Sequence, residues 1–240
     1  MLASSYPVTI PVGGIQLSAD LAIPARAGGL VVFAHGSGSS RFSPRNRSVA
    51  RALRKHGLAT LLLDLLTLDE ERAEASKETL RSDMDFLAER LIGATEWIHA
   101  YSQVARHPIG YFGASSGAAA ALIAAARRPE MIGAIVARGG RADLAGPMLA
   151  KVRAPTLLVI GSEDGHVLAL NRDAASRMTA PVQIEIVEGA SHLFEEAGAL
   201  EQVGELAARW FLAHLRPLAW TQLRDREMPR RNGSASASDS

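Results

Sequence analysis

The chain has 240 residues, of which 48% are hydrophobic, and its formal net charge is +1. This length and apolar content suffice to bury the core of one α/β domain. The near-zero charge excludes a general electrostatic attraction to nucleic acid or to an anionic membrane. The absence of cysteine excludes thiol catalysis, cysteine-rich metal sites and disulfide bonds.

The first ten residues, MLASSYPVTI, do not have the charged and apolar regions of a signal peptide. No apolar stretch approaches the ~18 residues that a membrane-spanning helix needs. We therefore expect a cytoplasmic protein. We expect its catalytic domain to extend over residues 1–216. We expect a disordered or loosely packed tail over residues 217–240, because the sequence there becomes polar and ends in a Ser/Ala alternation.

Short β-branched or leucine-rich runs alternate with longer helical patterns, which is typical of a mostly parallel sheet with crossover helices on both faces. The expected strands are residues 8–12 and 15–23 as an opening hairpin, then 30–34, 58–65, 109–112, 132–136, 156–160 and 183–187. The expected helices are residues 44–56, 84–101, 118–128 and 200–215. This order predicts an α/β fold with a sheet of about eight strands.

Two connecting segments bear on the shape of the site. Between the strands expected at 132–136 and 156–160 there is room for one short helix, so we expect no cap domain. Residues 67–83 are charged and weakly periodic, and we expect them to form a long loop at the rim of the pocket. An open site of this kind suits small or protruding substrates.

A Gly-x-Ser-x-Gly motif, Gly113-Ala114-Ser115-Ser116-Gly117, lies between an expected strand and an expected helix. In this context a sharp turn lifts the serine hydroxyl above the sheet, and the glycines allow close packing around it. The motif alone is weak because Gly and Ser are common in this chain, and a serine that only caps the helix is the alternative. The strand-turn-helix context favours Ser115 as a nucleophile.

A serine nucleophile needs a base, and it needs an acid that orients the base. Asp164 follows an expected strand at the carboxyl edge, where open α/β sheets place their sites. Its neighbour Glu163 is the alternative acid, and either carboxylate could instead cap the next helix. His192 lies on the loop after the last expected strand. The order Ser115, Asp164, His192, each after a separate strand, predicts a catalytic triad.

Attack on an ester carbonyl also requires two backbone amides that bind the oxyanion. One is the amide of Ser116, and the other is the amide of Ser37 in residues 35–41, which we call the oxyanion loop. We expect the ring of His35 and the carboxylate of Asp64 to brace this loop. A phosphate cradle is excluded because neither G-x-x-x-x-G-K-[ST] nor G-x-G-x-x-G spacing occurs.

Arginines near the expected site are compatible with an anionic substrate. Arg41 lies on the oxyanion loop, and Arg138 and Arg141 follow one of the expected strands. Together with Gly36 of the oxyanion loop, Arg41 and Arg138 are the candidate contacts to a substrate that bears a carboxylate or phosphate. The alternative is that these arginines face solvent and pair with acidic neighbours such as Asp143.

The segments HGSGSS, GASSG, GSEDGHV and GASHLF together resemble the dienelactone hydrolase branch of the α/β-hydrolase superfamily. The resemblance covers about residues 8–215, and it is closer still to bacterial hydrolase domains found attached to or near phosphoribosyltransferases. It implies an eight-stranded, mostly parallel sheet and hydrolysis of an ester or lactone without metal or cofactor. Dienelactone itself is not carried over as the substrate, because dienelactone hydrolases proper use a cysteine where this chain has Ser115.

Three functions are therefore considered. The first is hydrolysis of a small carboxylic ester, thioester or lactone through an acyl-enzyme. The second is acyl transfer by the same residues, and the third is a non-catalytic binding protein with this fold, which the complete triad disfavours. We expect a small-molecule ester as substrate, no metal or cofactor, no nucleic-acid or membrane partner, and a monomer or homodimer.

Overall fold

The computed structural model describes residues 3–74, 80–101 and 103–215, so the tail expected at 217–240 lies outside the described residues. The strands are β1 (Tyr6–Val12), β2 (Ile15–Ala22), β3 (Leu30–Ala34), β4 (Ala59–Leu63), β5 (Ile109–Ala114), β6 (Ile132–Arg138), β7 (Thr156–Gly161) and β8 (Val182–Val187). Every expected strand occurs, with its ends within about two residues of those predicted from the apolar runs.

The eight strands form one sheet in the order β1-β2-β4-β3-β5-β6-β7-β8. The β1–β2 and β2–β4 pairs are antiparallel, and all pairs from β4 to β8 are parallel. Because parallel strands end at the same edge, the loops after β3, β5, β6, β7 and β8 meet at the carboxyl edge. The expected α/β fold with a mostly parallel, eight-stranded sheet is confirmed.

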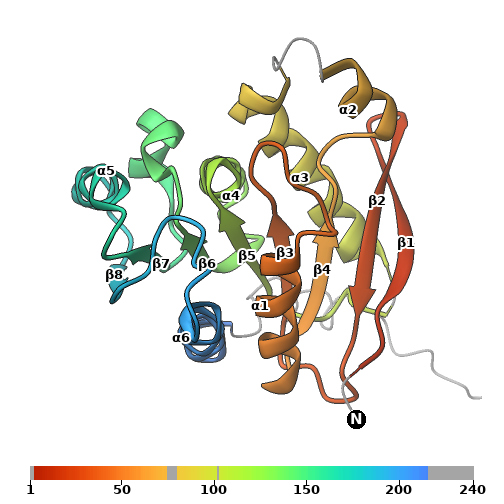
Figure 1. Cartoon of the computed structure of the whole chain (residues 1–240). Helices are drawn as coiled ribbons and strands as arrows, with labels where there is room; N and C mark the ends of the chain where they lie inside the picture. The colour runs from red at the N-terminus through yellow and green to blue at the C-terminus, as the bar shows by residue number, and fades with distance from the viewer. Residues whose placement is uncertain (1–2, 75–79, 102, 216–240) are drawn as a thin grey trace, which may run out of the picture.

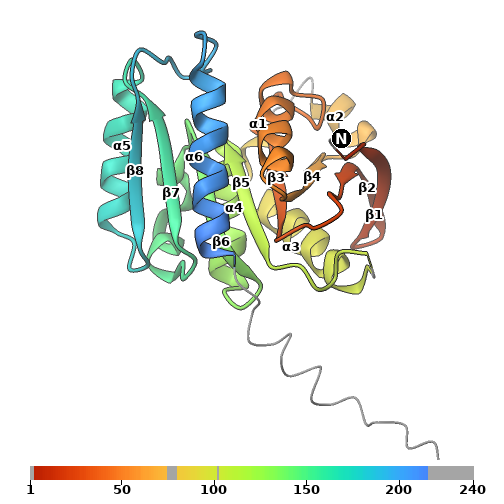
Figure 2. The same cartoon turned by 90° about the horizontal axis from the view of Figure 1, so that it is seen from below.

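Helices cover both faces of the sheet (Figure 1 and Figure 2). On one face, α1 (Pro44–Lys55) packs against α6 (Ala199–His214). On the other face lie α3 (Met84–Ala100), α4 (Ser116–Arg127) and α5 (Gly165–Ser176). The helix after the nucleophile motif is thus on the opposite face from the helix after the oxyanion loop.

The core consists of two apolar clusters, one on each face of the sheet. The central strand β3 is fully buried, and its side chains alternate between them: Val31 and Phe33 face one cluster, whereas Val32 and Ala34 face the other. Burial on both faces explains the unbroken apolar runs of the parallel strands. It also makes the sheet a rigid platform for the loops at its carboxyl edge.

The segment at 67–83, expected to be a loop, is partly helical. It contains α2 (Leu68–Glu74) and a short 3₁₀ helix, η1 (Leu80–Ser82). A capping box starts α2: the Glu70 N–H donates to Thr67 Oγ1 at 3.2 Å, and the Thr67 N–H donates to the Glu70 carboxylate at 2.8 Å. The Thr-x-x-Glu spacing is a known start signal for a helix, and here it forms one turn of helix or more despite the weak periodicity that predicts a loop.

Between β6 and β7 lies η2 (Ala142–Lys151), a 3₁₀ segment with a kink at Gly146. This agrees with the single short helix expected there, and no cap domain is inserted at this point. Among the helices of the described ranges, none combines the length and the apolar character needed to cross a membrane.

Candidate active site

Ser115 lies on the sharp turn between β5 and α4. Its φ of 50° and ψ of −126° fall in a region that non-glycine residues rarely adopt. The Ser115 N–H donates to the carbonyl of Arg138 at 3.2 Å, and the Ser115 carbonyl accepts from the N–H of Arg141 at 3.0 Å. Strained backbone of this kind persists where the surroundings fix it, and it clusters at functional sites.

The glycines around Ser115 are required by close packing of the backbone. A Cβ at Gly113 would lie 2.4 Å from the Cα of Ala118, and a Cβ at Gly117 would lie 2.3 Å from the carbonyl oxygen of Ala34. Gly36 of the oxyanion loop approaches the nucleophile in the same way, since a Cβ there would lie 3.0 Å from the Ser115 Cβ. Only glycine allows the helix and the loop to come this close to the turn.

Asp164 and His192 meet at the carboxyl edge of the sheet. His192 Nδ1 lies 2.6 Å from Asp164 Oδ2, and the Asp164 side chain is 13% exposed. Because an ionised carboxylate can only accept, Nδ1 carries the proton and Nε2 is left as the basic nitrogen. The Glu163 carboxylate instead accepts from Ser162 Oγ at 3.4 Å. The structure thus brings Asp164, and not Glu163, to the histidine.

The loop that carries His192 is anchored on both sides of the histidine. Phe194 is fully buried, and its φ of 57° marks a second strained turn. A Cβ at Gly161 would lie 2.1 Å from the carbonyl oxygen of Ala190, so the loop packs directly on the end of β7. These contacts fix the backbone on which the imidazole is carried.

The His192 ring lies over the end of β6, next to the Ser115 turn. A Cβ at Gly139 would lie 3.4 Å from His192 Nδ1 and 3.5 Å from its Cε1. Gly139 directly follows Arg138, which accepts the Ser115 N–H. Within the described ranges no hydrogen bond joins Ser115 Oγ to His192. Catalytic hydrogen bonds of free enzymes often form fully only when substrate binds.

The oxyanion loop is held at both ends. At its start, His35 Nε2 accepts from the Leu65 N–H at 3.1 Å, so Nδ1 carries the proton and donates to the Gly36 carbonyl at 3.0 Å. At its end, Asp64 Oδ1 accepts from the Arg41 backbone N–H at 2.6 Å, and the same carboxylate pairs with the Arg41 guanidinium. Both contacts agree with the bracing roles expected for His35 and Asp64.

The backbone N–H groups of the two expected oxyanion donors differ in their hydrogen bonding. Ser116 is the first residue of α4, where a backbone N–H has no acceptor within the helix. The Ser37 N–H, in contrast, donates to the Ser116 hydroxyl oxygen at 2.9 Å. The motif predicts a role for the amide of Ser116 but carries no signal for its hydroxyl, so sequence reasoning did not include this group in the site.

Two of the three arginines near the site are paired with carboxylates of the protein. Arg141 donates two hydrogen bonds to Asp143, at 2.9 and 2.8 Å, and these bonds lower the pKa of Asp143 and raise the pKa of Arg141. Arg41 pairs with Asp64, and its Nε also lies 3.7 Å from a carboxylate oxygen of Asp20. Internal pairing is therefore the observed state of both side chains.

Arg138 differs from these two arginines. The residue is 6% exposed, and neither its Nε nor its Nη1 has a hydrogen-bond partner within the described ranges. The guanidinium carbon lies 5.7 Å from the centre of the Phe194 ring. Burial, and then the nearby charge of Arg45, lower the pKa of Arg138 to about 10. The side chain is therefore a cation at neutral pH, and it lies at the end of β6 near the ring of Phe194.

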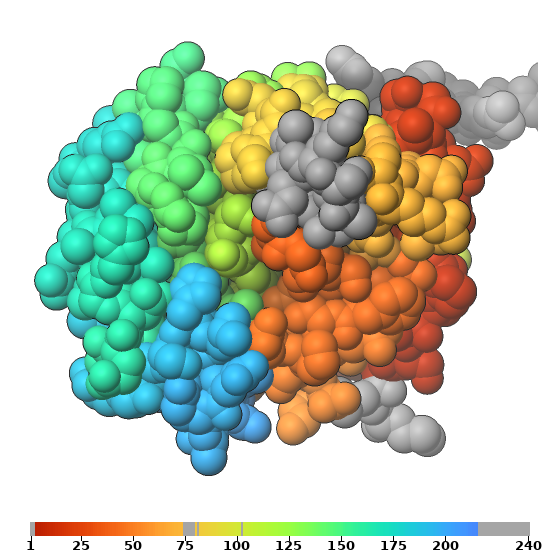
Figure 3. All heavy atoms as spheres, turned by 45° about the horizontal axis from the view of Figure 1, so that its top comes forward, coloured from red at the N-terminus to blue at the C-terminus, as the bar shows by residue number. Residues whose placement is uncertain are grey.

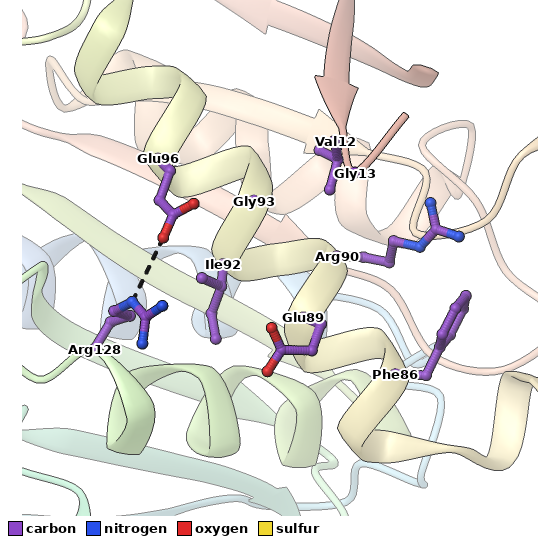
Figure 4. Close-up of a pocket in the computed structure, with 9 residues that line it drawn as sticks. All are labelled: Val12, Gly13, Phe86, Glu89, Arg90, Ile92, Gly93, Glu96 and Arg128. Atoms are coloured by element: carbon purple, nitrogen blue, oxygen red, sulfur yellow. Dashed lines mark ion pairs between the residues drawn. The ribbon is translucent and has the colours of Figure 1, made fainter. Parts of the chain in front are cut away.

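A hollow of about 370 Å³ lies away from Ser115, between the β1–β2 turn and α3 (Figure 4). Arg128 lies 3.5 Å from Glu96 across it, and Arg90 pairs with Glu70 at 2.6 Å. Its lining contains neither a serine nor a histidine. The lining therefore lacks the nucleophile and the base that a serine hydrolase requires. Its charged side chains are paired within the protein.

Segments from distant parts of the chain meet at the carboxyl edge. Figure 3 shows this edge of the molecule. The green residues that follow β6, the orange residues near the start of α1 and the blue residues that follow β8 are neighbours there. In the part of the chain that the structure describes, no three His, Asp or Glu side chains are grouped so as to hold a metal ion. A serine on a strained turn, an oriented histidine and a loop with backbone donors are the groups of nucleophilic catalysis.

This fold and arrangement of groups define an α/β-hydrolase. The model of the dienelactone hydrolase family matches residues 17–217, and the chain belongs to that family. A dienelactone hydrolase from Anabaena variabilis, known from a crystal structure, is 50% identical in sequence to this chain. The two structures match with a TM-score of 0.88 over 90% of this chain and 100% of that one. Est1E from Butyrivibrio proteoclasticus shares the fold, with a TM-score of 0.72 at 17% identity over 88% of this chain and 98% of that one.

Two proteins of Mycobacterium tuberculosis, provisionally named phosphoribosyl transferases, are 50% identical over 208 residues. The match covers 87% of this chain and 46% of each relative. The chain thus spans less than half the length of these curated relatives. The family indicated by the four sequence segments is confirmed.

Proposed function

We propose that this chain is a serine hydrolase that cleaves a small carboxylic ester, thioester or lactone through an acyl-enzyme. The observation that carries the proposal is the 2.6 Å contact between His192 and Asp164, at the same sheet edge as the strained Ser115 turn. It supports catalysis because Asp164 fixes the tautomer in which His192 Nε2 can accept a proton. Membership of the dienelactone hydrolase family supports hydrolase activity in general.

In the proposed reaction, His192 Nε2 takes the proton of Ser115 as Oγ attacks the carbonyl carbon. Asp164 stabilises the imidazolium, and the amides of Ser37 and Ser116 bind the oxyanion. The imidazolium then protonates the leaving alcohol or thiol, and the acyl group stays on Ser115. Water, deprotonated by His192, releases the acid. Acyl transfer would follow the same steps with an alcohol or amine in place of water.

Steady-state hydrolysis of a panel of short-chain aryl esters tests this proposal. Wild-type protein should turn them over, and Ser115→Ala should lower kcat by roughly 10,000-fold or more, because no other group can form the acyl-enzyme. Ser176→Ala, at an exposed serine of α5, is the matched control and should keep the wild-type rate. Undiminished turnover by Ser115→Ala would remove this serine from the mechanism.

We further propose that the substrate carries a carboxylate or phosphate that binds Arg138. A buried guanidinium without a partner is costly, because its lost hydration is not replaced by contacts within the protein. Nε and Nη1 of Arg138 are buried donors without a hydrogen-bond partner among the described residues, and guanidinium donors match the oxygens of such an anion. Arg138 ends β6 at the carboxyl edge of the sheet, and its backbone carbonyl accepts from the Ser115 N–H at that edge.

Two matched aryl esters test this substrate class: a neutral acetate and a succinate half-ester with a free carboxylate. Wild-type protein should prefer the half-ester, and Arg138→Met should lower kcat/KM for it by about 10-fold to 100-fold, the range of a lost charged hydrogen bond. Turnover of the acetate should change little. Arg41→Gln is the control and should keep the preference, since Arg41 is already paired with Asp64. An unchanged preference in Arg138→Met would exclude the contact.

The transferase activity in the names of the Mycobacterium tuberculosis relatives is not part of this proposal. The 208 matched residues make up 46% of each relative, so more than half of each relative lies outside the match. The family model that covers residues 17–217 of this chain is that of a hydrolase.

A further inference from the structure

We infer that the Ser116 hydroxyl is a positioning group that holds the Ser37 amide in its donor orientation before substrate binds. The inference rests on the proposed function and gives a role to a side chain that the Gly-x-Ser-x-Gly motif leaves open. It is based on the 2.9 Å hydrogen bond from the Ser37 N–H to Ser116 Oγ.

This hydrogen bond joins the two halves of the oxyanion site directly. Ser37 belongs to the loop after β3, whereas Ser116 begins α4, 79 residues later in the chain. His35 and Asp64 hold the two ends of the oxyanion loop, through a ring nitrogen and a carboxylate. The Ser116 hydroxyl acts between them, on the amide that is expected to donate to the substrate.

The peptide group that carries the Ser37 N–H lies in a tight, glycine-rich turn. Gly36 and Gly38 lie on either side, and Gly38 has a φ of 70°. The Ser37 N–H and the Gly36 carbonyl belong to one planar peptide group. That carbonyl accepts from His35 Nδ1 at 3.0 Å and from the Ser39 N–H at 3.1 Å, so the carbonyl end of the group is already held. Oxyanion donors are effective when they are oriented before the reaction, without reorganisation during it. Ser116 Oγ supplies an acceptor at the N–H end, so both ends of this peptide group are held in the free protein.

The hydroxyl oxygen accepts the same N–H that a substrate oxygen must use, so the reaction has to exchange one acceptor for the other. Rotation of the Ser116 side chain about one torsion is enough to release the N–H. A hydroxyl is a neutral acceptor, whereas an oxyanion forms a shorter and stronger charge-assisted hydrogen bond. The exchange therefore favours the charged transition state over the neutral carbonyl of the ground state.

Ser116→Ala tests the role, with Ser116→Thr as the variant that keeps a hydroxyl and Ser176→Ala as the control on α5. Alanine is a strong helix former, so the first turn of α4 should be retained. For Ser116→Ala we expect kcat and the affinity for a trifluoromethyl ketone each to fall about fivefold, the range of one lost hydrogen bond, while KM changes less than about twofold. Hydrogen–deuterium exchange at the Ser37 amide should become faster, and Ser116→Thr should restore the wild-type values.

Unchanged or faster turnover by Ser116→Ala, or unchanged exchange at the Ser37 amide, would overturn the positioning role. The exchange measurement does not depend on catalysis. If wild-type protein and Ser115→Ala were equally inactive on esters, the proposed function would fail, and amide exchange in Ser116→Ala would still decide whether the hydroxyl holds the Ser37 amide.

Discussion

The two sides of Ser115 are built in different ways. On the acid–base side, after β7 and β8, one side chain contacts another, with His192 Nδ1 at 2.6 Å from the Asp164 carboxylate. On the oxyanion side, after β3 and β4, side chains hold backbone groups. For example, Asp64 Oδ1 accepts from the backbone N–H of Arg41 at 2.6 Å. In the proposed reaction, the groups that act are thus side chains on the first side and amides on the second.

This difference predicts two kinds of response to substitution. A change on the acid–base side removes or misorients a group that moves a proton, so activity should fall steeply. A change on the oxyanion side leaves every amide in the chain and alters only how well it is placed, so the loss should be graded. Stability should respond more on the oxyanion side, because the bracing groups there also hold the loop to the sheet.

The largest effect within this comparison is expected for Asp164→Asn. An amide in place of the carboxylate favours the wrong histidine tautomer, and kcat should fall about 10,000-fold with little change in the folded structure. Glu163→Gln is the matched control, and its kcat should stay near that of wild type because Glu163 contacts Ser162 and not His192. A loss that appears with Glu163→Gln and not with Asp164→Asn would transfer the role to Glu163.

A smaller effect is expected for Asp64→Asn. The side chain keeps one oxygen that can accept the Arg41 N–H, but the ion pair with the Arg41 guanidinium is lost. We expect kcat to fall roughly tenfold and the melting temperature to decrease, since hydrogen bonds to charged groups contribute about 1.5–3 kcal/mol. Ester kinetics and thermal unfolding measure the two effects. A loss of kcat as large as that of Asp164→Asn would contradict the division between the two sides.

The sheet and the acid–base side could be predicted from the sequence because both depend on local signals in chain order. Unbroken apolar runs marked the buried strands, and Asp164 and His192 each follow one of them. The choice between Asp164 and Glu163 needed the structure, because neighbouring residues after a strand point in different directions. The start of α2 was predictable from Thr67 and Glu70, whose capping-box spacing is a local signal.

The oxyanion side was less predictable because its contacts join segments far apart in the sequence. The Ser37–Ser116 hydrogen bond spans 79 positions, and no local pattern reports it. The surroundings of the Arg138 side chain are also set by segments that are far apart in the sequence. Its position at the end of β6 is predictable from the sequence, but whether its Nε and Nη1 find a partner among the described residues depends on what packs around them.

Covalent labelling with a fluorophosphonate, followed by mass spectrometry of the labelled peptide, tests the central claim most directly. A serine activated by a neighbouring histidine attacks such a phosphorus centre and stays modified. The account predicts one phosphonyl group on Ser115 of the wild-type protein, slower labelling of Asp164→Asn and no labelling of Ser115→Ala. An unlabelled wild-type protein, or a label on another residue, would contradict it.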